Sequence, residues 1–449
     1  LVPNQHRQLG SNLRSMMLLR RDPDAAMTGV GPVRRTDCQR CGCATLELLY
    51  KFFVLVLALF WIFPASASGL CPMPGLSAFY QSLDDLRSGK RTRPVTVLHL
   101  GDSHIALDHL TGVLRDNWQQ KFGYAGRGFP AGVPYKYYSP QGFSISMDAG
   151  WKSISSLKTS ASGPFGMSGF RVETSEPGAQ MELTGEHAIE IVEIEAYGGP
   201  DTGAVLLTLG DAAPLRLSTR SKMNDVVFLR VPAAAVHKVR LQAAGDGPVV
   251  LLGWTILSSL KAQPPGVRYD SYGIIGATLN VIENWNGTIV DAEIRRLAPD
   301  LVILGYGTNE GFNDGIDLDD YGHLFETFIH RLERLAPQAS ILALGAFDAA
   351  RPAKDKEKMN CGDGYAVPPN LDALRHVQRN IVLKNNHAFI DGARAMGGTC
   401  SIEEWVNASP PLAWPDHVHL RPSGARLAGQ AIWEGIMGPY EMQACRPRL

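Results

Sequence analysis

The chain has 449 residues, which is long for one average domain and sufficient for a large hydrophobic core. Hydrophobic residues make up 45% and charged residues 19% of it, as in an ordinary globular protein. The 43 basic and 44 acidic residues balance, and no basic stripe is present, so we expect no nucleic-acid partner.

The first recognisable segment is a short apolar run at residues 52–63, FFVLVLALFWIF. Basic residues precede it and Pro-Ala-Ser-Ala-Ser follows it at 64–68. A membrane-spanning helix needs about 20 apolar residues, so this pattern is instead typical of a signal peptide, cleaved near Ala67. It predicts a periplasmic or secreted protein that touches the membrane only transiently, through this segment. An uncleaved anchor or a buried strand is the alternative.

Residues 1–44 lie unusually far upstream of that run, and we interpret 1–68 as an upstream extension plus signal peptide, with Met17 or Met27 nearer the start of translation. Cys38, Cys41 and Cys43 lie in this region, but no partner pair has the spacing of a zinc finger. We expect no metal site.

Residues 69–126 are predicted to begin an α/β domain. A helical pattern at 75–89 leads to an apolar strand, VTVLHL (95–100), and to an amphipathic stretch at 108–123. The strand ends in Gly-Asp-Ser-His. Because ligands of an open parallel sheet bind beyond the carboxyl ends of its strands, Ser103 is a candidate nucleophile at the start of a helix.

The middle zone, 127–263, has short alternating apolar segments separated by turns and no useful helical period. The expected strands are 187–197, 204–210, 225–231, 237–243 and 248–254. This pattern predicts an antiparallel β-sandwich inserted into the α/β domain.

Residues 264–449 return to alternation of strands and helices. The expected strands are 301–307, 340–347 and 387–392, and the expected helices are 320–337, 371–386 and 424–437. Continuous apolar strands alternating with helices predict a parallel sheet covered on both faces, a three-layer α/β/α fold.

A serine nucleophile needs a base, and WPDHVHL (414–420) supplies the best candidate. The Asp-x-x-His spacing lets Asp416 hold Nδ1 of His419 while Nε2 faces outward. His417 is a competing base. Nearer Ser103, His99 is expected in the core and the side chain of His104 is expected to point elsewhere.

An oxyanion needs fixed hydrogen-bond donors, and two segments offer them. Asn309, in GYGTNEG (305–311), follows a strand and carries a side-chain amide. Gly276, in YDSYGIIGAT (269–278), permits the close approach of a backbone N–H, and Gly273 is a plausible substitute.

Four cysteines follow the signal peptide: Cys71, Cys361, Cys400 and Cys445. An even number in an oxidising compartment suggests two disulfides among three possible pairings. Cys361–Cys400 would staple one late segment and Cys71–Cys445 would tie the two ends together; free buried thiols are the alternative.

Gly-Asp-Ser, a downstream Gly, a Gly-x-x-Asn-type block and Asp-x-x-His, in this order, resemble the SGNH (GDSL-like) hydrolases. The resemblance implies a flavodoxin-like α/β/α fold, Ser103 as nucleophile, and Asp416 and His419 as the rest of the triad. It implies an oxyanion hole formed by Ser103, Gly276 and Asn309, and no metal or organic cofactor.

The GDSH and GTNE variants and the β insertion resemble the peptidoglycan O-acetylesterase branch, whose insertion is similar to a carbohydrate-binding module. This implies a serine esterase that acts on an acetylated glycan of the cell wall. A polysaccharide O-acetyltransferase and a non-catalytic wall-binding protein are the alternatives. Aromatic residues of the insertion could stack on sugars, namely Tyr135, Tyr137, Tyr138, Trp151 and Trp254, with core or loop packing as the alternative.

Overall fold

The structure is a computed structural model that describes residues 73–130, 133–134, 138, 140–157, 162–258, 265–353, 360–362 and 364–442. The expected upstream extension and signal peptide, Cys71, Cys445, Tyr135 and Tyr137 lie outside these residues. Among the helices in these ranges, none combines the length and the apolar character needed to span a membrane.

A five-stranded parallel sheet forms the centre of the α/β part, in the order β10-β1-β11-β12-β16. Its strands are β1 (Val95–Gly101), β10 (Val267–Gly273), β11 (Leu301–Gly305), β12 (Ser340–Gly345) and β16 (Ala388–Asp391). Numbered along the chain, this order is 2-1-3-4-5, the flavodoxin-like arrangement. The strand order therefore reverses at β1, which is where such sheets bind ligands.

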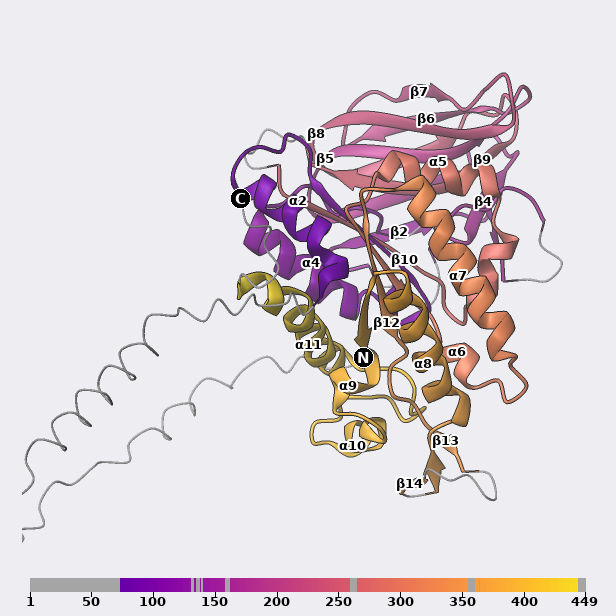
Figure 1. Cartoon of the computed structure of the whole chain (residues 1–449). Coiled ribbons are helices and arrows are strands. Elements are labelled where there is room, and N and C mark those ends of the chain that lie inside the picture. The colour runs from indigo at the N-terminus through magenta and orange to yellow at the C-terminus, as the bar shows by residue number, and fades with distance from the viewer. Residues whose placement is uncertain are drawn as a thin grey trace, which may run out of the picture. The chain divides into compact units, whose positions relative to one another are not determined.

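Helices cover both faces of this sheet (Figure 1). The helices on one face are α2 (Ser77–Arg87), α4 (His109–Phe122) and α11 (Pro422–Glu441), and those on the other are α5 (Gly287–Leu297), α7 (Leu318–Leu335) and α8 (Pro369–Lys384). The side chains of β1 alternate between the two layers: Val97 packs with the first group and Leu98 with the second. The predicted three layers are thus present.

Side-chain caps fix where several of these helices begin. Asp317 accepts hydrogen bonds from the amides of Asp319 and Asp320 at the start of α7, and Asn286 caps α5 by accepting from Ile289. The remaining short elements are η1 (Pro74–Leu76), α3 (Ser103–Ala106), η2 (Leu279–Asn284), α6 (Thr308–Gly311), β13 (Arg351–Pro352), β14 (Asn360–Gly362), β15 (Tyr365–Ala366), α9 (Gly392–Met396) and α10 (Ser401–Asn407).

Three glycines lie side by side at the carboxyl end of the sheet. Gly101 pairs with Gly273 on one neighbouring strand and with Gly305 on the other. A Cβ atom on Gly273 would lie 2.0 Å from the amide nitrogen of Ala106, and one on Gly101 would lie 2.5 Å from the carbonyl oxygen of Gly305. The absence of side chains here lets α3 pack tightly over the ends of the strands.

The insertion folds into one eight-stranded antiparallel sheet, in which β2 pairs with β5 beside the path β3-β4-β9-β5-β8-β6-β7. Its strands are β2 (Phe143–Met147), β3 (Lys152–Ser155), β4 (Phe170–Thr174), β5 (Gln180–Gly198), β6 (Ala204–Leu209), β7 (Leu215–Ser218), β8 (Asp225–Ala243) and β9 (Val249–Leu257). The two strands expected at 225–231 and 237–243 are one long strand, β8. The sheet bends where the register of β5 against β8 shifts, between Thr184 and Ile191.

The two parts share one hydrophobic core. Phe129 stacks on Tyr272 of β10 with ring centroids 4.2 Å apart, and Trp254 of β9 belongs to the same cluster as Ile294 of α5. An ion pair between Glu193 of β5 and Arg296 adds a polar contact. Whether residues 127–263 are a domain that folds by itself stays a prediction.

One disulfide lies in the described residues and joins Cys361 of β14 to Cys400, the residue before α10. It is one of the pairings that the sequence left open. The bridge closes a loop across 39 residues and ties the segment after β12 to the segment after β16.

Candidate active site

Ser103 lies where the central strand of the sheet passes into a helix. The carboxylate of Asp102, which directly follows β1, accepts from the amide of His104 and so caps α3. This cap fixes the turn and places Ser103 at the first position of α3, beyond the carboxyl end of β1. Ser103 is 4% exposed.

The structure brings Ser103, His419 and Asp416 into one chain of hydrogen bonds. Oγ of Ser103 lies 2.9 Å from Nε2 of His419, although 316 residues separate the two. Nδ1 of His419 lies 2.7 Å from Oδ2 of Asp416. With Nδ1 donating to the carboxylate, Nε2 is free to accept the serine proton.

Asp416 is held by the backbone of its own loop. Its Oδ1 accepts from the amides of Val418 and His419, both at 3.0 Å. Burial alone would raise the pKa of Asp416, but the hydrogen bonds from the His419 ring and these two amides outweigh it and lower the pKa to about 2. The carboxylate is therefore ionised across the ordinary pH range and favours a proton on Nδ1.

The two predicted oxyanion donors also lie together. Nδ2 of Asn309, on α6, donates to the carbonyl oxygen of Ala277 at 2.8 Å, next to Gly276. This bond orients the amide and leaves its second N–H available. Gly276 has a φ of +79°, and no atom lies within 4 Å of where its Cβ would be.

Gly273, the alternative to Gly276 as an oxyanion donor, has a structural role instead. It is the last residue of β10, packs under α3, and its carbonyl accepts from the hydroxyl of Tyr138. In contrast, the amides of Ser103 and Gly276 have no acceptor among the residues that the structure describes. These two N–H groups and the second N–H of the Asn309 amide are thus free to donate to a ligand.

Glu310 joins the two loops that carry these donors, and the sequence reasoning did not single it out. Its Oε1 accepts from the amide of Leu279 at 2.7 Å, and its Oε2 accepts from the amide of Gly307 at 3.1 Å. Burial raises the pKa of Glu310 to about 7, although these hydrogen bonds oppose the shift. In the sequence, the only signal for Glu310 was its position directly after Asn309.

His104 supports the imidazole of His419. The two rings stack with centroids 5.7 Å apart, and Nε2 of His104 lies 3.1 Å from the carbonyl oxygen of Val418. Burial lowers the pKa of His104, but the hydrogen bond and charge of Asp102 outweigh it and raise the pKa overall. We expected the side chain of His104 to point elsewhere, but its ring lies beside that of His419, and its two nitrogens face Asp102 and the Val418 carbonyl.

The other histidines have separate partners. Nδ1 of His99 lies 2.6 Å from the hydroxyl of Tyr269 in the core, as expected. The ring of His417 stacks on Tyr365 with centroids 3.6 Å apart. Nδ1 of His417 also lies 2.8 Å from Oε2 of Glu403, but the two atoms are not aligned for a hydrogen bond.

The aromatic residues suggested as sugar platforms are mostly internal. Trp151 and Trp254 are 4% and 1% exposed, and both belong to the core. Tyr138 is half-buried and packs on Phe170. No cluster of potential metal ligands occurs in the part of the chain that the structure describes.

Comparison with solved structures found similarity over most of the chain. A structure described as "Peptidoglycan O-acetylesterase in action, 5 min" matches with a TM-score of 0.67 and 22% identity, over 83% of this chain and 97% of the other. No family model and no curated protein matched.

Two further matches are weaker. A family two carbohydrate esterase from Clostridium thermocellum in complex with cellohexaose gives a TM-score of 0.30 at 13% identity, over 67% of this chain and 100% of the other. A lipase/acylhydrolase from Enterococcus faecalis gives 0.28 at 18% identity, over 38% of this chain and 77% of the other.

The first match and the sheet order agree on the architecture that the sequence predicted. The chain has the three-layer α/β/α fold of the SGNH type, with an antiparallel sheet inserted after its first strand and helices.

Proposed function

We propose that this chain is an SGNH-type serine esterase that removes O-acetyl groups from a cell-wall polysaccharide, most specifically peptidoglycan. The observation that carries the proposal is the hydrogen-bonded series Ser103–His419–Asp416 at the carboxyl end of β1. A serine hydroxyl beside an oriented imidazole is the arrangement that activates the serine for attack on an ester.

In the first half of the proposed reaction, Nε2 of His419 takes the proton of Ser103 while Oγ attacks the acetyl carbonyl carbon. The resulting oxyanion accepts hydrogen bonds from the amides of Ser103 and Gly276 and from Nδ2 of Asn309. The bond to the sugar oxygen then breaks, and that oxygen takes the proton from His419. The sugar leaves and acetyl-Ser103 remains.

In the second half, His419 takes a proton from water, and the hydroxide oxygen attacks acetyl-Ser103. The same donors hold the second oxyanion. Oγ of Ser103 leaves with the proton from His419, and acetic acid departs and ionises. Every proton is moved by the same imidazole, and the reaction uses groups of this chain and water.

Two observations support a wall glycan as the substrate. A solved structure that matches 83% of the chain with a TM-score of 0.67 is described as a peptidoglycan O-acetylesterase. The Cys361–Cys400 disulfide fits an oxidising compartment, as does the expected signal peptide. Both point to a periplasmic or secreted enzyme that meets acetylated glycan outside the cytoplasm.

The test is acetate release from O-acetylated peptidoglycan, measured beside acetylated xylan and beside a chitooligosaccharide acceptor, with Ser103→Ala as the control. We expect acetate from peptidoglycan and none above background from the variant. Acetate from xylan alone would overturn the choice of substrate. Acetylated oligosaccharide without free acetate would identify an acetyltransferase with the same residues. Glycan binding without either product would identify a non-catalytic wall protein.

A further inference from the structure

The loop that carries Asp416 and His419 is a short hairpin with a defined register. Ala413 and Leu420 form an antiparallel bridge. The amide of Trp414 donates to the carbonyl oxygen of His419 at 2.8 Å, and that of Arg421 donates to Leu412 at 2.9 Å. This pattern places Trp414 directly opposite His419. Directly opposite residues have their Cβ atoms roughly 4.5–5.5 Å apart on the same face of the hairpin.

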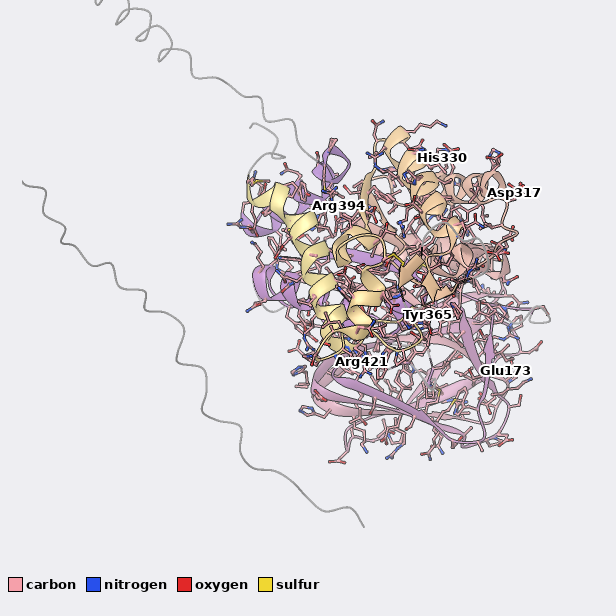
Figure 2. All side chains as sticks on the ribbon, turned by 90° about the horizontal axis from the view of Figure 1, so that it is seen from below. Glu173, Asp317, His330, Tyr365, Arg394 and Arg421 are labelled. Atoms are coloured by element: carbon pink, nitrogen blue, oxygen red, sulfur yellow. A yellow bond between two sulfur atoms is a disulfide. The ribbon has the colours of Figure 1, made fainter. Side chains whose placement is uncertain are left out.

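Burial follows the alternation that this register requires. Ala413 and Leu420 are 1% and 3% exposed and face the core, whereas Trp414 is 43% exposed. The guanidinium carbon of Arg421 lies 4.0 Å from the centroid of the Trp414 ring. Figure 2, which views the molecule from below, shows Arg421 close to where α11 begins. The Trp414 indole is thus held by a neighbour and still open to solvent.

The guanidinium of Arg421 is itself anchored. Its Nε donates to the carbonyl oxygen of Ala413 at 3.2 Å, so it is fixed to the backbone of the hairpin that it stacks on. An indole ordered in this way loses little side-chain freedom when a ligand packs on it. A large exposed apolar side chain held in one place has the character of a binding platform.

The proposed reaction indicates what lies beside this indole. His419 must protonate the oxygen of the departing sugar, so that oxygen has to come within hydrogen-bond reach of Nε2. The sugar ring attached to it therefore lies close to the imidazole of His419, whose side chain is 33% exposed. Trp414 is the residue opposite His419 on the hairpin face, and a pyranose presents a face of C–H groups that packs on an aromatic ring.

We propose that the Trp414 indole, held by Arg421, is a binding site for the pyranose ring that carries or adjoins the scissile ester. This inference rests on the proposed function, because it takes His419 as the acid that protonates the leaving sugar. It assigns sugar recognition to the catalytic hairpin rather than to Trp151 and Trp254, which are buried.

The kinetic test compares Trp414→Ala and Trp414→Phe on two esters. With O-acetylated peptidoglycan we expect kcat/KM to fall about ten- to a hundredfold for Trp414→Ala, with partial rescue by Trp414→Phe. With ethyl acetate, whose alcohol has no ring, both variants should keep the wild-type rate. Tyr124→Ala is the control: it removes an aromatic side chain of similar exposure, 45%, outside the hairpin. It should change the rate on neither ester.

An unchanged rate of Trp414→Ala on peptidoglycan would overturn the platform. So would equal losses on both esters, or an equal loss for Tyr124→Ala. If the wild type hydrolyses ethyl acetate but no glycan ester, the proposed substrate fails and the platform is tested by binding. That experiment is a ¹⁹F NMR titration of the Ser103→Ala variant labelled with 5-fluorotryptophan. The added probe is a soluble peptidoglycan strand. The Trp414→Phe substitution identifies the Trp414 resonance by removing it. A shifted Trp414 resonance supports the platform, and an unshifted one rejects it.

Discussion

His417 and His419 stand two residues apart in one hairpin but contact different partners. The ring of His419 contacts Oγ of Ser103, whereas the ring of His417 stacks on Tyr365 and lies beside Glu403. His417 has a positive φ of 55°, which turns the backbone between the two. The two neighbouring imidazoles therefore have separate surroundings, and only one of them touches the serine.

From this difference we expect Ser103→Ala and His419→Ala each to reduce hydrolysis of a small acetyl ester to near background, a loss on the order of 10⁶ in kcat. His417→Ala should keep the chemistry, with any loss appearing as lower thermal stability. Steady-state kinetics beside a melting curve separate the two effects. An inactive His417→Ala protein together with an active His419→Ala protein would reverse the assignment of the base.

Asp416→Asn should retain the fold and lower kcat by about 10⁴, because an amide at this position no longer stabilises the imidazolium or favours a proton on Nδ1. The loss of kcat in Asp416→Asn should be smaller than that in Ser103→Ala. Since the pKa of Asp416 is about 2, the wild-type carboxylate is ionised throughout an assay range of roughly pH 5–8. The loss should therefore be present at every pH of this range, and an Asp416→Asn protein that kept the wild-type kcat would contradict the role.

Asn309→Ala should lower kcat by about 10²–10³ and leave KM nearly unchanged, as expected when a donor to an oxyanion is removed. The reason is that its amide contacts the charge that develops in the transition state and little of the ground-state ester. Kinetics on one small ester are sufficient to separate kcat from KM. A rise in KM at constant kcat would indicate that Asn309 binds the substrate instead.

Glu310→Ala should lower kcat at least about tenfold, since it leaves the buried amides of Leu279 and Gly307 without an acceptor and frees the two donor loops. Glu310→Gln keeps one acceptor oxygen and should recover part of the rate. If Glu310 were merely structural, both variants would have a lower melting temperature, and the kcat of Glu310→Ala would not fall below that of Glu310→Gln. Equal activity of the Ala variant and the wild type would exclude Glu310 from positioning the donors.

The parts of this architecture that the sequence predicted are those with local signals. The strand before Ser103, the helix at 424–437 and the Asp-x-x-His spacing each depend on residues close together in the chain. The strand β10 was not predicted, because VRYDSYG contains Arg268 and Asp270, which look like solvent-facing residues. In the structure these two form a buried ion pair, and Asp270 is 0% exposed.

Long-range pairing explains most of the remaining differences. The strands expected at 225–231 and 237–243 are one strand, β8, which continues through Pro232 opposite Ile191, where the register of the sheet shifts. Glu310 and His104 could not be assigned from the sequence, since their roles depend on loops that approach only in the fold. Trp414 lies in the loop that carries the triad residues, but its exposure could not be predicted from sequence.

The last prediction concerns two buried carboxyl groups where the inserted sheet meets α5. Glu195 of β5 and Glu293 of α5 are 7% and 3% exposed, and Oε2 of Glu293 accepts from the amide of Met167. Burial, and then the neighbouring charge of Glu293, raise the pKa of Glu195 well above its usual range. One shared proton allows the two side chains to hydrogen-bond; two negative charges would repel each other.

A carboxyl whose pKa is raised by folding stabilises the protein most below its unfolded-state pKa, about 4.3, and the contribution is lost as the pH rises through the folded-state pKa. Glu195→Gln fixes the hydrogen-bonding pattern of the protonated form. We therefore expect it to raise the free energy of unfolding relative to the wild type by about 1–3 kcal/mol at pH 8 and by less at pH 5. Glu186→Gln, at an exposed position of the same strand, is the matched control and should have no such effect. Chemical denaturation at pH 5 and pH 8 measures the free energy of unfolding of each protein. A Glu195→Gln protein that is less stable than the wild type at pH 8 would mean that the ionised pair is the stabilising form.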